Sequence, residues 1–446
     1  MNNGEGHTIY MLGIGGIGMS ALARYYHSQG HTVAGYDRTP SPLTRQLENE
    51  GMAIHYEDRP DLLPAHIDFV VYTPAVPKDL KEFETLRQNN VKIMKRAEAL
   101  GKVTEGHFTI AVAGTHGKTT TTAMVAHILN QCGMSTTAFI GGIANNFDSN
   151  LLLSKEKDYI IVVEADEFDH SFLQLHPDIS IINSIDADHL DIYGDRQHVV
   201  QSFNDFAALT ERNVIVKEGL DVEAWNKVIF GFDDDCDYHI SEIASGRGTT
   251  VFGINAEGCD IAIQLPMAGR HNMLNATAAY IAARKVGLER QAIVDALATF
   301  KGVKRRFDIR VNNERHCYID DYAHHPEEIR SCLTAVKGAF PDKRLSLVFQ
   351  PHLYSRTRDF MDGFAEVLAL ADELILLDIY PARELPIEGI TSQALLDKIQ
   401  MADKHLCQKS DLVGLIESEK PELLVTMGAG DIDRFVEPLE NMIKTW

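Results

Sequence analysis

Short runs of consecutive apolar residues recur along the chain, and each is followed by a glycine-rich or polar stretch. Five of these runs are Thr8–Leu12, Thr32–Tyr36, Asp68–Tyr72, Tyr159–Glu164 and Ile179–Asn183. A run that is apolar at nearly every position, rather than at alternate positions, is typical of a strand buried on both faces of a parallel sheet. Segments long enough for helices separate the runs, and Ser20–Gln29 is the helix predicted after the first strand. The pattern therefore predicts an α/β fold.

The strands fall into three successive groups. A second group opens with Phe108–Ala113, and a third follows the basic stretch 301–306, with buried-type strands at Leu345–Phe349, Glu373–Leu377 and Leu423–Met427. The chain has 446 residues, which is too many for a single hydrophobic core of typical size. We predict three α/β domains: a Rossmann-like N-terminal domain at 1–104, a central domain at 105–302 and a Rossmann-like C-terminal domain at 303–446.

The most informative motif is Gly114–Thr121, which directly follows the strand Phe108–Ala113. Glycines let backbone N–H groups close around phosphate oxygens, a lysine reaches the terminal phosphates, and a threonine hydroxyl can ligate Mg²⁺. The full P-loop spacing fails, because Val112 stands where the first glycine is expected; an ordinary strand-to-helix turn is the alternative. We predict a P-loop ATPase-like central domain whose ATP-binding residues are Gly114, Thr115, His116, Gly117, Lys118, Thr119 and Thr120.

A second glycine cluster follows the first strand. Gly13, Gly15 and Gly18 match G-x-G-x-x-G, and Asp37 lies near the end of the next strand, as in a dinucleotide site. The motif requires only that the backbone can approach a diphosphate closely at the start of a helix. A UDP-sugar meets this requirement as well as NAD does. Hydride transfer to NAD would leave the second nucleotide loop, with Lys118, unexplained.

Carboxylates and an imidazole follow the two strands after the phosphate loop. Glu164 ends one strand, and Asp188 and His189 come just after the next. Because the carboxyl ends of parallel strands meet at one sheet edge, these groups can gather beside the phosphate loop, where Mg²⁺ takes oxygen ligands. The alternative is ordinary solvated loop polarity.

The balance of acidic and basic residues limits which ligands and partners the chain can bind. With 42 Lys and Arg against 64 Asp and Glu, the net charge of −22 argues against nucleic-acid binding and requires local cations at any phosphate site. The six cysteines are scattered without a C-x-x-C pair, which favours reduced thiols in the cytoplasm. Neither a signal peptide nor a membrane-spanning run is present, so we expect a cytoplasmic enzyme with no membrane partner, as a monomer or homodimer.

These motifs, taken in order, resemble the Mur ligases of peptidoglycan synthesis over essentially the whole chain. The matching segments are Gly13–Met19, Gly114–Thr121, Asp186–Asp191, Gly269–Ala276, Arg305–Asp308, Asp320–Pro326 and Phe349–Thr357. The shortened phosphate loop is itself similar to that of this family. The resemblance implies an ATP- and Mg²⁺-dependent ligase that joins L-alanine to the lactyl carboxylate of UDP-N-acetylmuramate through an acyl phosphate.

The resemblance also implies roles for individual residues. The UDP-sugar loop would comprise Gly13, Gly15, Gly16, Ile17, Gly18 and Asp37. The catalytic residues would be Lys118, Glu164, His189 and Arg306, and the metal ligands Thr119, Glu164 and His189. The remaining ATP contacts would be Asn272 and Asn275 by the adenine and Arg306 and Asp321 from the C-terminal domain, with His325 and Arg356 near the alanine. Without the family, Asn272 and Asn275 are as well explained by helix capping, and Lys304–Arg306 by a solvated linker.

The chain departs from the family pattern at two positions. Leu353 stands where several relatives carry Arg, which places more weight on Arg356, and Ser184 stands where an Asn is frequent, with Asn183 shifted by one. The absence of Lys between Leu190 and Val216 favours the alanine-adding member over ligases of later steps. Three alternatives stay open: a peptide-recycling ligase of the same fold, an NAD-dependent dehydrogenase, and a nonenzymatic nucleotide-regulated scaffold.

Overall fold

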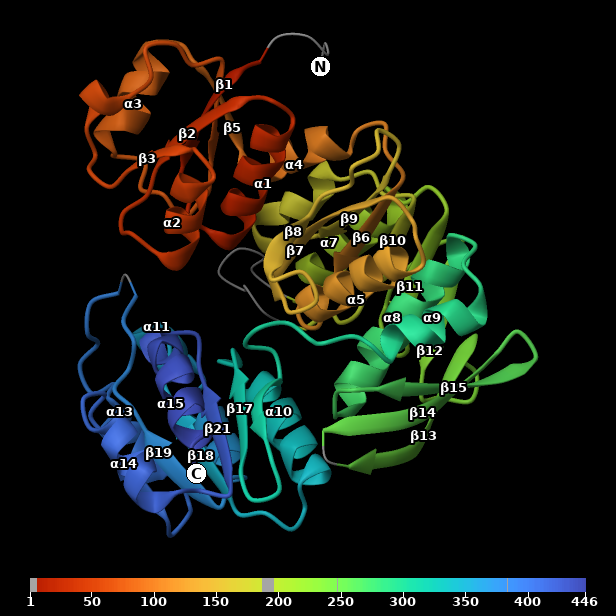
Figure 1. Cartoon of the computed structure of the whole chain (residues 1–446), viewed down its shortest axis with the longest axis vertical. Helices are drawn as coiled ribbons and strands as arrows, with labels where there is room; N and C mark the ends of the chain where they lie inside the picture. The colour runs from red at the N-terminus through yellow and green to blue at the C-terminus, as the bar shows by residue number, and fades with distance from the viewer. Residues whose placement is uncertain (1–5, 187–195, 247, 383) are drawn as a thin grey trace. The chain divides into compact units, whose positions relative to one another are not determined.

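The structure, a computed structural model, describes residues 6–186, 196–246, 248–382 and 384–446. Its contacts divide the chain into two compact units (Figure 1). One unit comprises Met1–His239 with Thr277–Ala296, and the other Ile240–Ala276 with Leu297–Trp446. None of the helices in the described ranges combines the length and apolarity needed to cross a membrane.

The first unit opens with a five-stranded parallel sheet of order β3-β2-β1-β4-β5. Its elements are β1 (Thr8–Leu12), α1 (Ile17–Ser28), β2 (Thr32–Tyr36), α2 (Pro42–Asn49), β3 (Ala53–His55), η1 (Pro60–Leu62), β4 (Phe69–Tyr72), α3 (Lys81–Gln88), β5 (Lys92–Lys95) and α4 (Arg96–Thr104). The first two predicted strands have the predicted bounds. Helix α1 begins at Ile17 instead of the predicted Ser20, because Gly16 occupies its N-cap. The glycine loop is thus shorter than the sequence suggested.

Part of a ten-stranded sheet also lies in this unit, where its strands run β12-β11-β10-β6-β9-β7-β8. Its elements are β6 (Thr109–Ala113), α5 (Lys118–Gln131), β7 (Thr136–Ala144), β8 (Ser149–Leu152), β9 (Ile160–Glu164), η2 (Phe168–Gln174), β10 (Ile179–Ile182), α7 (Arg196–Ala208), β11 (Asn213–Lys217) and β12 (Lys227–Gly231). All neighbours from β12 to β7 pair in parallel, and β8 pairs antiparallel to β7. The carboxyl ends of β6, β9 and β10 therefore lie along one edge, where the predicted polar residues follow.

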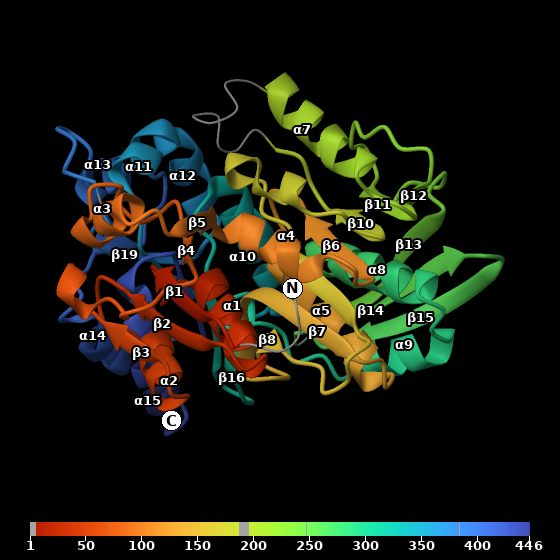
Figure 2. The ribbon, with the colours of Figure 1, turned by 90° about the horizontal axis from the view of Figure 1, so that it is seen from above.

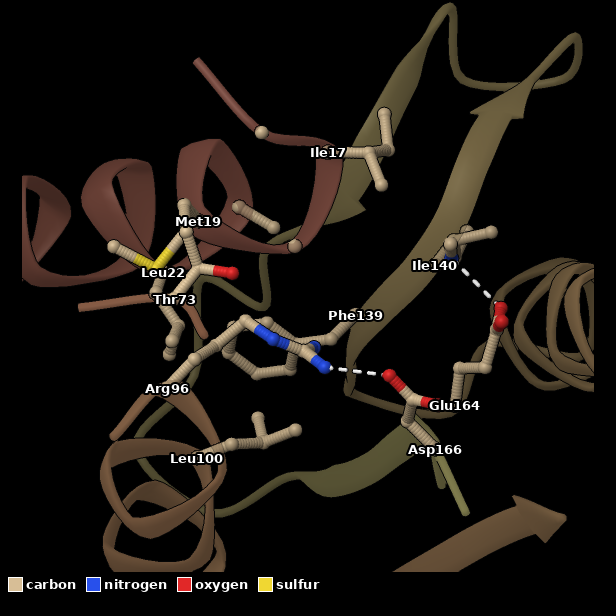
Figure 3. A pocket seen from close by; sticks show the side chains of 14 residues that line it. Ile17, Met19, Leu22, Thr73, Arg96, Leu100, Phe139, Ile140, Glu164 and Asp166 are labelled. Atoms are coloured by element: carbon tan, nitrogen blue, oxygen red, sulfur yellow. Dashed lines mark hydrogen bonds and ion pairs between the residues drawn. The ribbon is translucent and has the colours of Figure 1, made fainter. Parts of the chain in front are cut away.

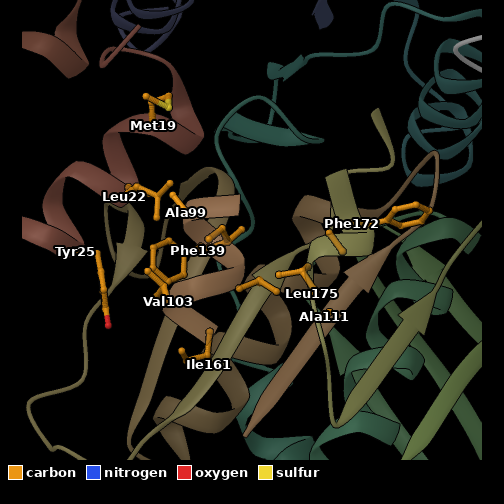
Figure 4. Packing of buried hydrophobic residues seen from close by; sticks show 14 of the residues in the cluster. Met19, Leu22, Tyr25, Ala99, Val103, Ala111, Phe139, Ile161, Phe172 and Leu175 are labelled. Atoms are coloured by element: carbon orange, nitrogen blue, oxygen red, sulfur yellow. The ribbon is translucent and has the colours of Figure 1, made fainter. Parts of the chain in front are cut away.

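The N-terminal sheet and the phosphate-loop sheet share one hydrophobic core. Met19, Leu22 and Tyr25 of α1 belong to the same buried cluster as Phe139 of β7 and Ile161 of β9 (Figure 4). Helix α4 packs on η2, and helix α1 packs on β7 and β8. Figures 1 and 2 both show α1 beside β7 and β8. The loop after β1 is thereby placed beside the phosphate-loop sheet.

The second unit contains an antiparallel hairpin and a six-stranded sheet. Strand β13 (Tyr238–Gly246) begins beside β12 and continues into this unit, where β14 (Thr249–Ala256) and β15 (Cys259–Leu265) pair. Helix α8 (Arg270–Lys285) spans the boundary between the units, and α9 (Arg290–Leu297) follows.

The six-stranded sheet has the order β16-β17-β21-β18-β19-β20, parallel except for the edge strand β16. Its elements are β16 (Asp308–Asn312), β17 (Cys317–Asp321), α10 (Pro326–Ala339), β18 (Leu345–Phe349), α11 (Tyr354–Asp359), α12 (Met361–Leu368), β19 (Glu373–Leu376), α13 (Ser392–Lys398), β20 (Lys404–Leu406), α14 (Leu412–Glu419), β21 (Leu423–Met427), η3 (Asp431–Phe435) and α15 (Val436–Ile443). Helices α14 and α15 cover one face, and Phe364 of α12 packs on Phe349 from the other. The predicted Rossmann-like character is confirmed.

Candidate active site

The phosphate loop turns sharply between β6 and α5. Gly114 has a φ of +134° and Gly117 a φ of +81°, so both lie in the left-handed region that glycine adopts without strain. A Cβ at Gly114 would also come within 2.9 Å of the Ser184 backbone nitrogen. Gly117 is the N-cap of α5 and supplies no capping side chain. A glycine turn followed by an uncapped helix start is suited to bind phosphate.

Ser184, which follows β10, holds this loop in place. Its Oγ accepts a hydrogen bond from the His116 N–H at 2.8 Å and lies 2.9 Å from the Thr115 Oγ1. The neighbouring Asn183 is buried and donates to Thr121 Oγ1 at 2.9 Å. The departure from the family pattern thus places a hydroxyl against the loop backbone and the amide against helix α5. Sequence reasoning had left the role of this pair open.

Lys118 is engaged with a carboxylate that the sequence did not single out. Its Nζ donates to both oxygens of Glu167, at 2.9 and 2.8 Å, and to the Gly114 carbonyl at 2.6 Å. The two side chains are 14% and 4% exposed. Burial alone would lower the pKa of Lys118, but the attraction of Glu167 and Glu164 outweighs it and raises the pKa, so the ammonium stays charged. Thr119 and Thr120 follow in the first turn of α5, both buried.

Glu164, the last residue of β9, is positioned by the neighbouring strand β7. Its Oε2 accepts a hydrogen bond from the Gly141 N–H at 2.9 Å, drawn as a dashed line beside Ile140 in Figure 3. A Cβ at Gly141 would overlap the Glu164 carboxylate, so glycine at this strand position lets the carboxylate lie against the backbone. The predicted metal ligand is therefore fixed by a backbone contact from a strand that the sequence reasoning had not identified.

A pocket of about 270 Å³ joins the glycine loop of the N-terminal domain to Glu164. Gly16, Ile17 and Gly18 line it together with Glu164 and Asp166. Figure 3 shows Ile17, Glu164 and Asp166 around the pocket. Its volume lies near the lower end of the range for small-molecule sites. Two sites predicted from distant sequence segments thus meet in one cavity.

The glycine loop is held by the residue predicted beside it. Asp37 Oδ2 accepts a hydrogen bond from the Gly15 N–H at 2.8 Å, and the Gly13 N–H donates to the Tyr36 carbonyl at 2.8 Å. Gly13 has a φ of +81°, which requires glycine. In this structure Asp37 therefore shapes the loop, and one of its oxygens is already engaged.

Arg96, the first residue of α4, is the cation of this pocket, and sequence reasoning missed it. Its Nη2 donates to Asp166 Oδ2 at 2.8 Å, the second dashed line in Figure 3. A Cβ at Gly18 would come within 2.8 Å of the Arg96 Nη1, so the third glycine of the motif makes room for this side chain. The only sequence signal was a basic pair, Lys95 and Arg96, at the end of a strand.

The predicted adenine contacts lie in the second unit. Asn272 and Asn275 are buried on α8, with the Asn275 Nδ2 placed 3.4 Å from the Asn272 Oδ1 and the Asn272 Nδ2 donating to the Ala268 carbonyl at 2.8 Å. The two amides therefore lie side by side, as their spacing of three predicts.

Arg306 and Asp321 also lie in the second unit. The Arg306 guanidinium lies over the Tyr322 ring, 5.1 Å from its centroid. Asp321 accepts from the Phe307 N–H at 2.6 Å and the Ala323 N–H at 2.7 Å, one bond to each oxygen. Burial raises the pKa of Asp321, with Arg306 opposing the rise. In this structure Asp321 anchors two backbone segments.

The predicted amino-acid residues lie close to α11. Arg356 is half-buried and forms no ion pair within the described ranges, so its guanidinium is available. His325 is the N-cap of α10, with its ring edge-on to Phe360 at 4.5 Å.

Leu353, at the N-cap of α11, has a φ of +69°, a strained value for a side chain of this kind. Burial, with Arg356 among the nearby cations, lowers the pKa of His352 to about 4. His189 lies outside the described residues.

Comparison with known sequences matches three stretches to the Mur ligases. The Mur ligase family catalytic domain matches residues 8–108, the Mur ligase middle domain residues 112–283, and the Mur ligase glutamate ligase domain residues 305–430. The UDP-N-acetylmuramate--L-alanine ligase of Christiangramia forsetii is 48% identical over 97% of each chain. The enzyme of that name from Cytophaga hutchinsonii is 46% identical over 99% of this chain and 97% of its own.

Comparison with solved structures also finds ligases of this family. The UDP-N-acetylmuramate-alanine ligase of Thermotoga maritima superposes with a TM-score of 0.87 at 29% identity, covering 98% of this chain and 99% of its own. A murein peptide ligase of Psychrobacter arcticus gives 0.74 at 25% identity, with 99% of each chain covered. The three α/β domains, the shortened phosphate loop and the sequence relatives all indicate one family. The chain belongs to the Mur ligase family.

Proposed function

We propose that this chain is the ATP-dependent ligase that joins L-alanine to the lactyl carboxylate of UDP-N-acetylmuramate, giving UDP-N-acetylmuramoyl-L-alanine, ADP and phosphate. The observation that carries the proposal is the pocket that connects Gly16–Gly18 to Glu164, beside the phosphate loop. The high identity to ligases of that name supports the choice of substrates. The six cysteines are free thiols, which supports a cytoplasmic location.

The first step activates the carboxylate. A carboxylate is a poor acyl donor, because oxide cannot leave at neutral pH, and phosphorylation converts the leaving group into phosphate. A lactyl oxygen attacks the γ-phosphorus of ATP, forming a new P–O bond while the bond to the β-phosphate oxygen breaks and ADP departs. Lys118 balances the charge that develops on the transferred group.

The second step forms the amide. The neutral amine of L-alanine attacks the acyl carbon, and the tetrahedral oxyanion collapses with loss of phosphate. Arg356, with no ion pair among the described residues, is suited to grip the alanine carboxylate through two parallel hydrogen bonds. His325 is our candidate for the group that takes the proton from the amine.

The donor set at the loop suits Mg²⁺. Glu164 and Thr119 offer the oxygen ligands that Mg²⁺ prefers, and the Gly141 N–H occupies only one Glu164 oxygen. When bound, the ion would supply charge neutralisation at the transferred phosphate. We keep His189 as a proposed further ligand on the family resemblance alone.

The test is a coupled phosphate-release assay with several acceptors. We expect release that requires both UDP-N-acetylmuramate and L-alanine, with weaker rates for glycine and L-serine, and loss of at least about 10³-fold in Lys118→Ala. Full activity of that variant would refute the proposed role of the loop. Preference for a tripeptide acceptor would instead identify a peptide-recycling ligase.

A further inference from the structure

Consecutive residues between β9 and η2 hold cations from both predicted nucleotide sites. Asp166 binds Arg96 of the sugar-nucleotide pocket at 2.8 Å, and Glu167 binds Lys118 of the phosphate loop at 2.8 and 2.9 Å. The two cations come from different domains, and the carboxylates that hold them are adjacent in the chain. A movement that frees one carboxylate therefore acts on the other.

Both cations face sites where substrate anions belong. Arg96 lines the pocket with Gly16 and Gly18 of the glycine loop, and Lys118 is the first residue of α5, directly after the glycine turn that follows β6. Each carboxylate occupies the position of an anionic group, so a ligand phosphate or carboxylate has to displace it to reach the cation. Of the four groups, Glu167 is the most enclosed, with a side chain 4% exposed.

The segment that follows the two carboxylates contains two strained residues. Asp169 and His170 have φ values of +53° and +54°, the left-handed region that costs energy for any residue except glycine. The Lys95 ammonium pairs with Asp169, the first of the two strained residues. Further along the chain, the end of η2 packs on α4 so closely that a Cβ at Gly101 would come within 2.5 Å of the Gln174 carbonyl oxygen. The strained residues thus lie between the two ion pairs and a fixed anchor.

We infer that Asp166 and Glu167 act as a linked pair of placeholder carboxylates, so that ATP and the sugar nucleotide each promote binding of the other. When a ligand displaces Glu167 from Lys118, the segment shifts and the Asp166–Arg96 ion pair weakens. When a ligand displaces Asp166 from Arg96, the Glu167–Lys118 ion pair weakens in the same way. The inference rests on the proposed function, because it takes the occupants of the two sites from it. Linkage requires the two ligands to change each other's affinity by the same factor.

The experiment measures this factor by calorimetry on the full chain. The dissociation constant of AMP-PNP with Mg²⁺ is determined with and without saturating UDP-N-acetylmuramate, for the wild type, Asp166→Asn and Glu167→Gln. The control is Glu98→Gln, which alters a half-buried pair with Lys102 on the same helix α4 as Arg96. Thermal unfolding verifies that each variant is folded.

We expect the wild type and the Glu98→Gln variant to bind AMP-PNP about tenfold more tightly when the sugar nucleotide is present. In Asp166→Asn and Glu167→Gln the factor should fall below about twofold, because the displacement has been made in advance. Glu167→Gln alone should bind AMP-PNP more tightly than the wild type does, which a purely structural role or a metal-ligand role would not produce.

Two results would overturn the inference while leaving the proposed function intact: an unchanged factor in both variants, or weaker AMP-PNP binding in folded Glu167→Gln. Wild-type protein that binds neither ligand would overturn the proposed function, and the inference with it.

Discussion

Gly141→Ala is expected to separate activity from stability at the candidate active site. The residue lies in β7 and its φ is not in the left-handed region, so alanine is compatible with the backbone. The added Cβ would overlap the Glu164 carboxylate, which is the end of a flexible side chain and can move aside. The carboxylate would then leave the place that the Gly141 N–H gives it.

The two consequences differ in size. Losing the Gly141–Glu164 hydrogen bond costs about 1 kcal/mol, and replacing glycine by alanine returns about 0.5 kcal/mol through the unfolded chain, so net stability changes little. A displacement of about 1 Å at a reacting group costs on the order of 10²-fold in rate, or about 2.7 kcal/mol of transition-state stabilisation. We therefore expect a folded protein with kcat/KM lowered about 100-fold.

Phosphate release under steady-state conditions gives kcat/KM, and thermal unfolding gives the change in stability. Gly414→Ala is the matched control, because Gly414 lies in α14 with open space around its Cβ position, and it should be slightly stabilising without changing the rate. Wild-type kcat/KM in folded Gly141→Ala would refute the reasoning that the Glu164 carboxylate must lie where this backbone contact holds it.

Three further changes test other parts of the structure. Ser184→Ala removes the acceptor of the His116 N–H and should raise the KM for ATP about tenfold in a folded protein, measured by varying ATP; an unchanged KM would count against the loop-holding role. Arg356→Ala should raise the KM for L-alanine by at least about tenfold and leave that for ATP unchanged, and equal effects on both would contradict the assignment. Burial raises the pKa of Asp320 to about 6, with Arg305 opposing, so the folded state binds this proton more tightly than the unfolded chain does, and stability falls as pH rises from about 4 to about 6. Unfolding of Asp320→Asn across this range should therefore show a flatter pH dependence than the wild type, and an identical profile would refute the assignment.

The strands of the fold could be predicted because their information is local. Thr8–Leu12, Leu345–Phe349 and Leu423–Met427 are apolar at all but one position each, and all three are strands with those bounds. Other strands were not predicted, β7 among them, although it contains the apolar run Ala138–Ile140 directly before a glycine.

The side-chain partners of the site could not be predicted in the same way. Glu167 and Lys118 are 49 positions apart in the sequence, and Arg96 and Asp166 are 70 apart. Nothing local in either segment specifies these pairs, because they exist only once β6, β9 and α4 are assembled. The motif glycines were visible in the sequence, whereas Gly141 gained its meaning from the carboxylate opposite it.

The core shared by α1 and the phosphate-loop sheet has a consequence for the order of synthesis. Met19, Leu22 and Tyr25 emerge from the ribosome long before Phe139 and Ile161, the residues that bury them. Until β7 is made, the nascent N-terminal sheet carries an uncovered apolar face, a hazard for aggregation. A fragment that ends at residue 104 would keep that face permanently, so the first domain is expected to need the second for solubility as well as for its pocket.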